Sequence, residues 1–165
     1  MVVTRKKKNV LYRVAPIWKR LLSFIIDMLI LEFFVFSKFE GLMNSMVPKI
    51  PFTTVTESTL IQISVIASII AFFVILYFTV LEYAFGQTLG DMIIGLHLKT
   101  LIGEESGFWR VFASNLSFLP FFPFIILWII DPAMIIFSNS HQRFMQILVG
   151  LQVVEIYSLE KGGYQ

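Results

Sequence analysis

The sequence contains no cysteine among its 165 residues. This absence excludes disulfide bonds, thiolate metal sites and cysteine nucleophiles. Charged residues are also scarce, at 15% of the chain, whereas a soluble domain typically carries about a quarter. Hydrophobic residues make up 57% of the chain, and the mean hydropathy is +0.81. The composition therefore argues against a soluble enzyme or a free nucleic-acid-binding protein and predicts a membrane protein.

Basic residues are concentrated at the N-terminus. Seven of the 13 lysines and arginines precede the first acidic residue, Asp27, and these are Arg5, Lys6, Lys7, Lys8, Arg13, Lys19 and Arg20. Because positively charged flanks stay in the cytoplasm, we expect residues 1–20 to form a basic cytoplasmic segment that contacts anionic lipid and no nucleic acid. Asp27 and Glu32 interrupt the apolar run that follows, and no small-residue cleavage site closes it. We therefore interpret this run as an uncleaved helix, not as a signal peptide.

Three apolar runs follow, at about residues 17–37, 60–83 and 115–137. Each is close to the roughly 20 residues that a bilayer span needs. Prolines break or kink the third run, because proline removes a helical hydrogen bond. The expected fold is an all-α membrane protein, a helical bundle of three membrane segments with the third kinked or re-entrant. Small residues recur at helical spacing in the second run and predict a helix-packing stripe formed by Ser64, Ala67, Ser68 and Ala71.

A short sequence pattern occurs twice. Ile93–Leu98 and Leu148–Val153 each contain a hydrophobic turn, a Gly-Leu pair and an alternating polar and apolar segment. Alternation is typical of strands, so the two copies could pair as a small cytoplasmic strand-like element. Pairing requires the third run to return to the side it left, with a bend at Pro120 and Pro123, whereas a plain crossing forbids it. A chance match in a leucine-rich chain is the remaining alternative. Residues 155–165 are expected to form a flexible tail.

Charged residues within the apolar runs are the candidate functional residues. Each costs about 2.5–3.5 kcal/mol to insert near a helix centre, so each needs a partner. Arg20 and Asp27 lie on one helix face about 10 Å apart, which is too far for a direct ion pair. A third group or water must join them, and Asp131 in the third run is the best candidate. This predicts a buried charge site of Arg20, Asp27 and Asp131, either as a polar pathway or as a set of contacts that hold the helices together.

Motifs for catalysis are missing. The two histidines have no second metal ligand at suitable spacing, and the Gly-Gln-Thr-Leu-Gly segment at residues 86–90 lacks the Lys-Ser/Thr of a phosphate-binding loop. We therefore expect no catalytic residue, no metal site and no cofactor, and we expect that the protein is not an enzyme.

Three segments resemble the RDD family of small multi-pass membrane proteins, which is named for one arginine and two aspartates. Residues 15–27 resemble the family's opening, with Arg20 and Asp27 at the positions of the arginine and the first aspartate. Residues 85–96 are similar to its Gly-x-Thr-x-Gly-Lys-x-x-x-Gly-Leu segment. Residues 142–154 resemble its closing Arg-x-x-His-Asp-x-x-Ala-Gly-Thr-x-Val-Val. The resemblance spans residues 15–154 and thus an RDD-like transmembrane domain.

Two positions depart from the family pattern. Asp91 stands where a lysine is usual, and Met145-Gln146 stands where His-Asp is usual. The second aspartate is therefore either Asp131 or missing from this chain.

The resemblance implies a multi-pass protein of the cell membrane with a cytoplasmic N-terminus, in a family for which transport of ions or small solutes has been suggested. The alternative is a non-transporting membrane scaffold or accessory subunit. Three segments in one protomer can barely enclose a pathway, so transport would favour a homo-oligomer within the lipid bilayer.

Overall fold

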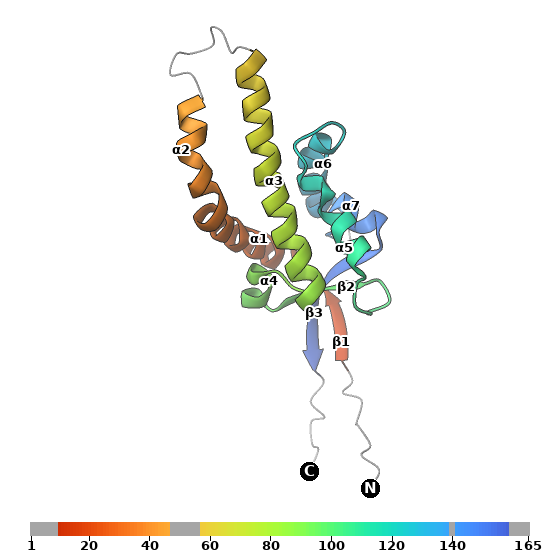
Figure 1. Ribbon diagram of the computed structural model, residues 1–165. Helices are drawn as coiled ribbons and strands as arrows, with labels where there is room; N and C mark the ends of the chain where they lie inside the picture. Colours follow the sequence, from red (N-terminus) through yellow and green to blue (C-terminus); the bar gives the residue numbers. More distant parts are fainter. Residues whose placement is uncertain (1–9, 47–56, 139–140, 159–165) are drawn as a thin grey trace, which may run out of the picture.

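The computed structural model describes residues 10–46, 57–138 and 141–158. Helices predominate, and a small sheet lies at one end of them (Figure 1). The sheet has three antiparallel strands in the order β1-β3-β2, namely β1 (Val10–Val14), β3 (Leu151–Ser158) and β2 (Leu96–Thr100). Its buried side chains form an apolar core with α5 (Phe108–Asn115), comprising Ala15, Leu96, Leu98, Val111, Leu151 and Val153.

The pairing between the two Gly-Leu segments is confirmed, because Leu98 pairs with Val153 in the β2–β3 ladder. One expectation about the chain ends is wrong, because residues 155–158 of the expected flexible tail are paired strand. The strand β1 lies within the predicted basic segment, of which residues 1–9 lie outside the described residues. Val10 pairs with Ser158, so both ends of the described chain lie side by side. The reason is that each of these segments completes the hydrogen bonds of the other, which sequence periodicity alone does not reveal. Residues 159–165 lie outside the described residues.

The first predicted membrane segment is helical but longer than predicted. It consists of α1 (Ile17–Leu31), a π-helical stretch (Glu32–Phe36) and α2 (Ser37–Met46). The π-helical stretch lies where the chain turns, since α1 runs across the base of α3 whereas α2 rises beside it (Figure 1). Wide helical turns of this kind are a recognised cause of helix bends.

The second predicted segment is α3 (Glu57–Phe85), and within the described ranges it alone is long and apolar enough to cross a membrane. Its side chains pack on the first segment through a cluster of Leu31, Val74 and Phe78. Its other faces expose large apolar side chains; Phe72, for example, is 61% exposed. Exposed apolar surface on this scale needs lipid or a partner protein to cover it.

The third predicted segment is broken at the prolines, as expected. After α5 the chain forms two short 3-10 helices (Leu116–Phe118 and Phe124–Ile126) and then α6 (Leu127–Phe137), which contains Pro132. The first 3-10 helix packs against α6, so the segment folds back on itself. A five-residue helix, α7 (Phe144–Leu148), then leads into β3. The chain thus leaves the sheet after β2 and returns to the same sheet.

Candidate functional site

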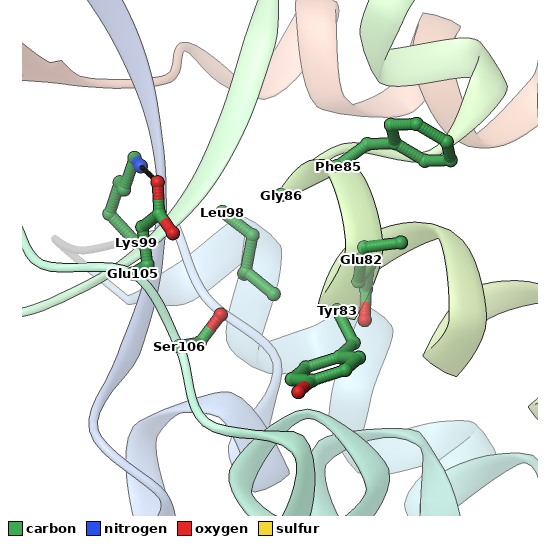
Figure 2. Close-up of a pocket in the computed structure, with 9 residues that line it drawn as sticks. Glu82, Tyr83, Phe85, Gly86, Leu98, Lys99, Glu105 and Ser106 are labelled. Carbon is green, nitrogen blue, oxygen red and sulfur yellow. Dashed lines mark ion pairs between the residues drawn. The ribbon is translucent and has the colours of Figure 1, made fainter.

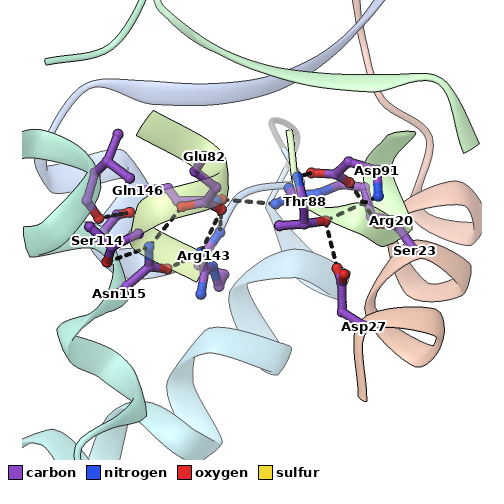
Figure 3. A network of polar contacts seen from close by, with 12 residues as sticks. Arg20, Ser23, Asp27, Glu82, Thr88, Asp91, Ser114, Asn115, Arg143 and Gln146 are labelled. Carbon is purple, nitrogen blue, oxygen red and sulfur yellow. Dashed lines mark hydrogen bonds and ion pairs between the residues drawn. The ribbon is translucent and has the colours of Figure 1, made fainter. Parts of the chain in front are cut away.

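Polar side chains gather at the sheet end of α3, close to α1, α4 (Leu89–Ile94), α5 and α7 (Figure 3). A small cavity lies between this end and β2 (Figure 2). Beside it is a network of polar contacts that extends from α1 to α7 (Figure 3). The short helix α4 follows α3 directly and packs against α1.

Asp27 is buried within this network, with 2% of its surface exposed. One carboxylate oxygen accepts hydrogen bonds from the Tyr77 hydroxyl (2.7 Å) and the Gly90 backbone N–H (2.8 Å). The other accepts from the Thr88 hydroxyl at 2.6 Å. Three donors compensate part of the cost of burying the carboxylate.

The start of α4 explains the Gly-x-Thr-x-Gly segment. Thr88 caps the helix: its hydroxyl accepts from the Asp91 N–H at 3.0 Å. Asp91, which stands where a lysine was expected, accepts from the Ser23 hydroxyl at 2.6 Å. Because Ser23 and Asp27 are four residues apart, they share the α1 face that meets α4. Gly90 allows this approach, since an added Cβ would lie 2.9 Å from Cγ of Asp27 and closer still to the Ser23 backbone oxygen.

A second group of contacts centres on Glu82, in the last turn of α3. Its carboxylate accepts from the Asn115 amide at 2.7 Å and lies 3.7 Å from the Arg143 guanidinium. Arg143 also donates to the Asn115 side-chain oxygen at 3.1 Å. Glu82 is 4% exposed and Asn115 is fully buried. These three side chains therefore tie α3, α5 and the start of α7 together.

Arg20 joins this second group and not Asp27. Its Nη2 donates to the Gln146 side-chain oxygen at 2.8 Å, and Gln146 is 1% exposed. Nη1 of Arg20 is buried and has no hydrogen-bond partner among the described residues. Gln146 stands where the family resemblance places the second aspartate, so a neutral amide faces Arg20 at that position.

The predicted bridging role of Asp131 is wrong. Asp131 is buried, but its carboxylate accepts from the Phe144 backbone N–H at 3.0 Å. Phe144 is the first residue of α7, whose N–H has no partner within the helix, and this donor satisfies the carboxylate locally. Among the described residues, Asp131 therefore contacts the start of α7, whereas Arg20 contacts Gln146.

The structure thus brings the three predicted site residues to one end of the molecule without placing them in contact. Sequence reasoning missed Asn115, Arg143 and Gln146. The only sequence signal for Gln146 was its place in the closing family segment, and Asn115 looked like an ordinary polar residue of an interfacial helix. The described residues contain no group of three or more His, Asp or Glu side chains that could hold a metal ion.

The predicted packing stripe lies mostly outside the intramolecular contacts. Ala71 is buried, whereas Ser64 is exposed and Ala67 and Ser68 are partly exposed. The Ser68 hydroxyl donates to the Ser64 carbonyl oxygen at 2.5 Å, which satisfies it within the helix. Three of the four residues therefore remain available to another helix.

The apolar helices and the buried charges at their sheet end define a small, mostly helical membrane protein. Its family follows from a sequence comparison: the RDD family profile matches residues 14–155, and the chain belongs to the RDD family. No curated protein and no solved structure matches the chain.

Proposed function

We propose that this protein moves an ion or small solute across the cell membrane through the polar network at the sheet end of α3. The observation that carries this proposal is the gathering of six charged side chains, all largely removed from solvent, at one end of a set of apolar helices. They are Arg20, Asp27, Glu82, Asp91, Asp131 and Arg143. Charges that are costly to bury in a membrane protein commonly mark a path for ions or protons.

The balance of charge in the network favours a cationic species. Four carboxylates face two guanidinium groups, which leaves a formal excess of two negative charges. Asp27 and Asp91 lie on the α1–α4 side, and Glu82 and Asp131 lie toward α7. A monovalent cation or a proton would reduce the repulsion among these carboxylates, whereas an anion would increase it.

The proposed working unit is a homo-oligomer. One protomer has few membrane segments, and the exposed part of the Ser64–Ala71 stripe offers a close-approach surface for a second copy. Chemical crosslinking in membranes tests this assembly, and a strictly monomeric protein would contradict it.

The proposed orientation places the N-terminus, the sheet and the C-terminus in the cytoplasm. The seven basic residues that precede Asp27 support a cytoplasmic N-terminus. The pairing of Val10 with Ser158 supports the placement of both chain ends on the same side of the membrane. Reporter fusions at Thr4 and at Gln165 are expected to report the cytoplasm, and a fusion at Thr54 the opposite side. An N-terminal and a C-terminal reporter on different sides would refute the re-entrant course of the third segment. Thr4, Thr54 and Gln165 lie outside the described residues.

The transport proposal is tested in liposomes that contain the purified protein and a dye sensitive to pH, Na⁺ or K⁺. We expect a cation flux that falls about tenfold or more in Asp27→Asn and in Glu82→Gln, because each variant removes a buried negative charge. Glu32→Gln is the matched control. Glu32 is exposed and begins the π-helical stretch that follows α1, so this variant should leave the flux unchanged. Size-exclusion elution identifies variants that fail to fold.

A non-transporting scaffold or accessory subunit is the second candidate. The observation in its favour is that the Asp27 carboxylate accepts three hydrogen bonds from its own chain, so the charge can act by fixing α1 on α4. A monomer without flux for any of the three cations would favour this function. If Asp27→Asn and Glu82→Gln both leave the cation flux unchanged, the cations do not pass through the polar network.

A further inference from the structure

The cavity at the sheet end of α3 has a volume of about 70 Å³. Its walls come from the last turns of α3, from β2 and from the segment before α5 (Figure 2). Glu82 lines one side, and Lys99, Glu105 and Ser106 line the other. The cavity therefore lies between a buried carboxylate of the network and the sheet face of the molecule.

The size and the lining of the cavity suit water. A cavity needs roughly 10–15 Å³ to hold one water molecule, so this one is large enough for water, and a buried water needs two to four polar partners. Four of the lining residues, Glu82, Lys99, Glu105 and Ser106, carry polar side chains.

The outer side of the cavity reaches solvent. The Glu105 side chain is 93% exposed and lies 3.8 Å from the Lys99 ammonium, whose side chain is 15% exposed. Ser106 follows directly in the chain but is buried. An exposed ion pair of this kind contributes little stability and opens readily, so it can cover the cavity without sealing it.

The inner side of the cavity ends at the network. Glu82 contacts Asn115 and Arg143 of the network and also lines the cavity. A proton or small cation that arrives through the cavity would meet Glu82 first and would then be within reach of the remaining charges of the network.

We propose that this cavity is a water-filled inlet through which water, and with it a proton or a small monovalent cation, reaches Glu82 from the sheet side of the membrane. The Lys99–Glu105 ion pair covers its mouth. The inlet rests on the proposed function, because it supplies the transport path with its first charged group. The inlet also gives the path an order: a cation that enters from the sheet side meets Glu82 first and Asp27 later.

The natural absence of cysteine makes the inlet testable by thiol labelling. Single-cysteine variants are prepared in proteoliposomes and treated with a small, water-soluble, cationic methanethiosulfonate reagent. Ser106→Cys introduces the thiol into the cavity wall. Ser114→Cys is the matched control, because Ser114 is fully buried on α5 and donates to the Val111 carbonyl oxygen away from the cavity. Glu105→Cys, at an exposed position, reports the maximum rate.

We expect Ser106→Cys to react at least about tenfold faster than Ser114→Cys, and faster with the cationic reagent than with an anionic one by about tenfold, because Glu82 and Glu105 outnumber Lys99. Adding Glu82→Gln should remove most of this preference. Adding Lys99→Ala should accelerate the labelling, because it removes the ion pair at the mouth.

Labelling of Ser106→Cys at the rate of Ser114→Cys would overturn the inlet whether or not the protein transports ions. Labelling that is fast but indifferent to reagent charge and to Glu82→Gln would also overturn it, because the cavity would then not lead to Glu82. Fast, charge-selective labelling without any cation flux would leave the water-filled inlet standing and would refute the transport function alone.

Discussion

Gly90→Ala is expected to destabilise the protein more than the corresponding change at any other described glycine. The new Cβ would lie 2.9 Å from both Cγ and Oδ2 of Asp27, and it would approach the Ser23 backbone oxygen even more closely. Separations below 3 Å require a shift, and backbone atoms of a packed helix shift at high cost. Helix α4 would have to move away from α1.

That movement would also break the hydrogen bonds that Asp27 accepts from α4, those of Thr88 and Gly90. Overpacking together with an undercompensated buried carboxylate should cost about 3–5 kcal/mol. For a chain of this length, such a loss lowers the midpoint of thermal unfolding by roughly 10 °C. The measurement is thermal unfolding of purified protein in detergent, supported by the amount of protein in membranes.

Gly41→Ala is the control for this prediction. Gly41 lies in α2, and nothing would come within 4 Å of an added Cβ. Alanine favours a helix over glycine by about 0.5–1 kcal/mol, so this variant should be neutral or slightly stabilised. Equal stability of Gly90→Ala and Gly41→Ala would mean that α1 and α4 do not pack as described.

The sequence predicted those parts of the fold that follow from local patterns. The length and apolarity of residues 60–83 predicted α3, and Pro120 and Pro123 predicted the break in the third segment. The repeated Gly-Leu pattern predicted the pairing of β2 with β3, because alternation and turn residues are local signals. The strand β1 carried no comparable signal, since a five-residue segment directly after a basic run has little periodicity to measure.

The candidate site was less predictable because its contacts join residues far apart in the chain. Cost of burial identified Arg20, Asp27 and Asp131 as residues that need partners, and Asp27 and Asp131 are indeed buried. Cost of burial does not identify the partners. Asp27 accepts a hydrogen bond from a backbone N–H of α4, and Asp131 accepts one from a backbone N–H at the start of α7. A search for residues of opposite charge does not consider backbone donors.

The pairing of Arg20 with Gln146 leads to the second large prediction. Gln146→Leu should cost about 2–4 kcal/mol, because it leaves the Arg20 guanidinium without the acceptor at 2.8 Å. Arg20→Met should cost less, since the Gln146 oxygen would still accept from the Arg143 backbone N–H at 3.3 Å. The double variant should be more stable than the sum of the two losses by about 1–3 kcal/mol, because the unpaired guanidinium is then gone.

A second double-mutant cycle, with Asp131→Asn in place of Gln146→Leu, tests whether Asp131 or Gln146 is the direct partner of Arg20. Asp131 reaches Arg20 through its charge and not through a hydrogen bond, so its coupling energy with Arg20→Met should stay below about 1 kcal/mol. Each cycle compares the parent protein, two single variants and the double variant by the midpoint of thermal unfolding and by membrane abundance. A larger coupling with Asp131 than with Gln146 would restore Asp131 as the direct partner of Arg20. It would also mean that α7 lies farther from α1 than the 2.8 Å contact requires.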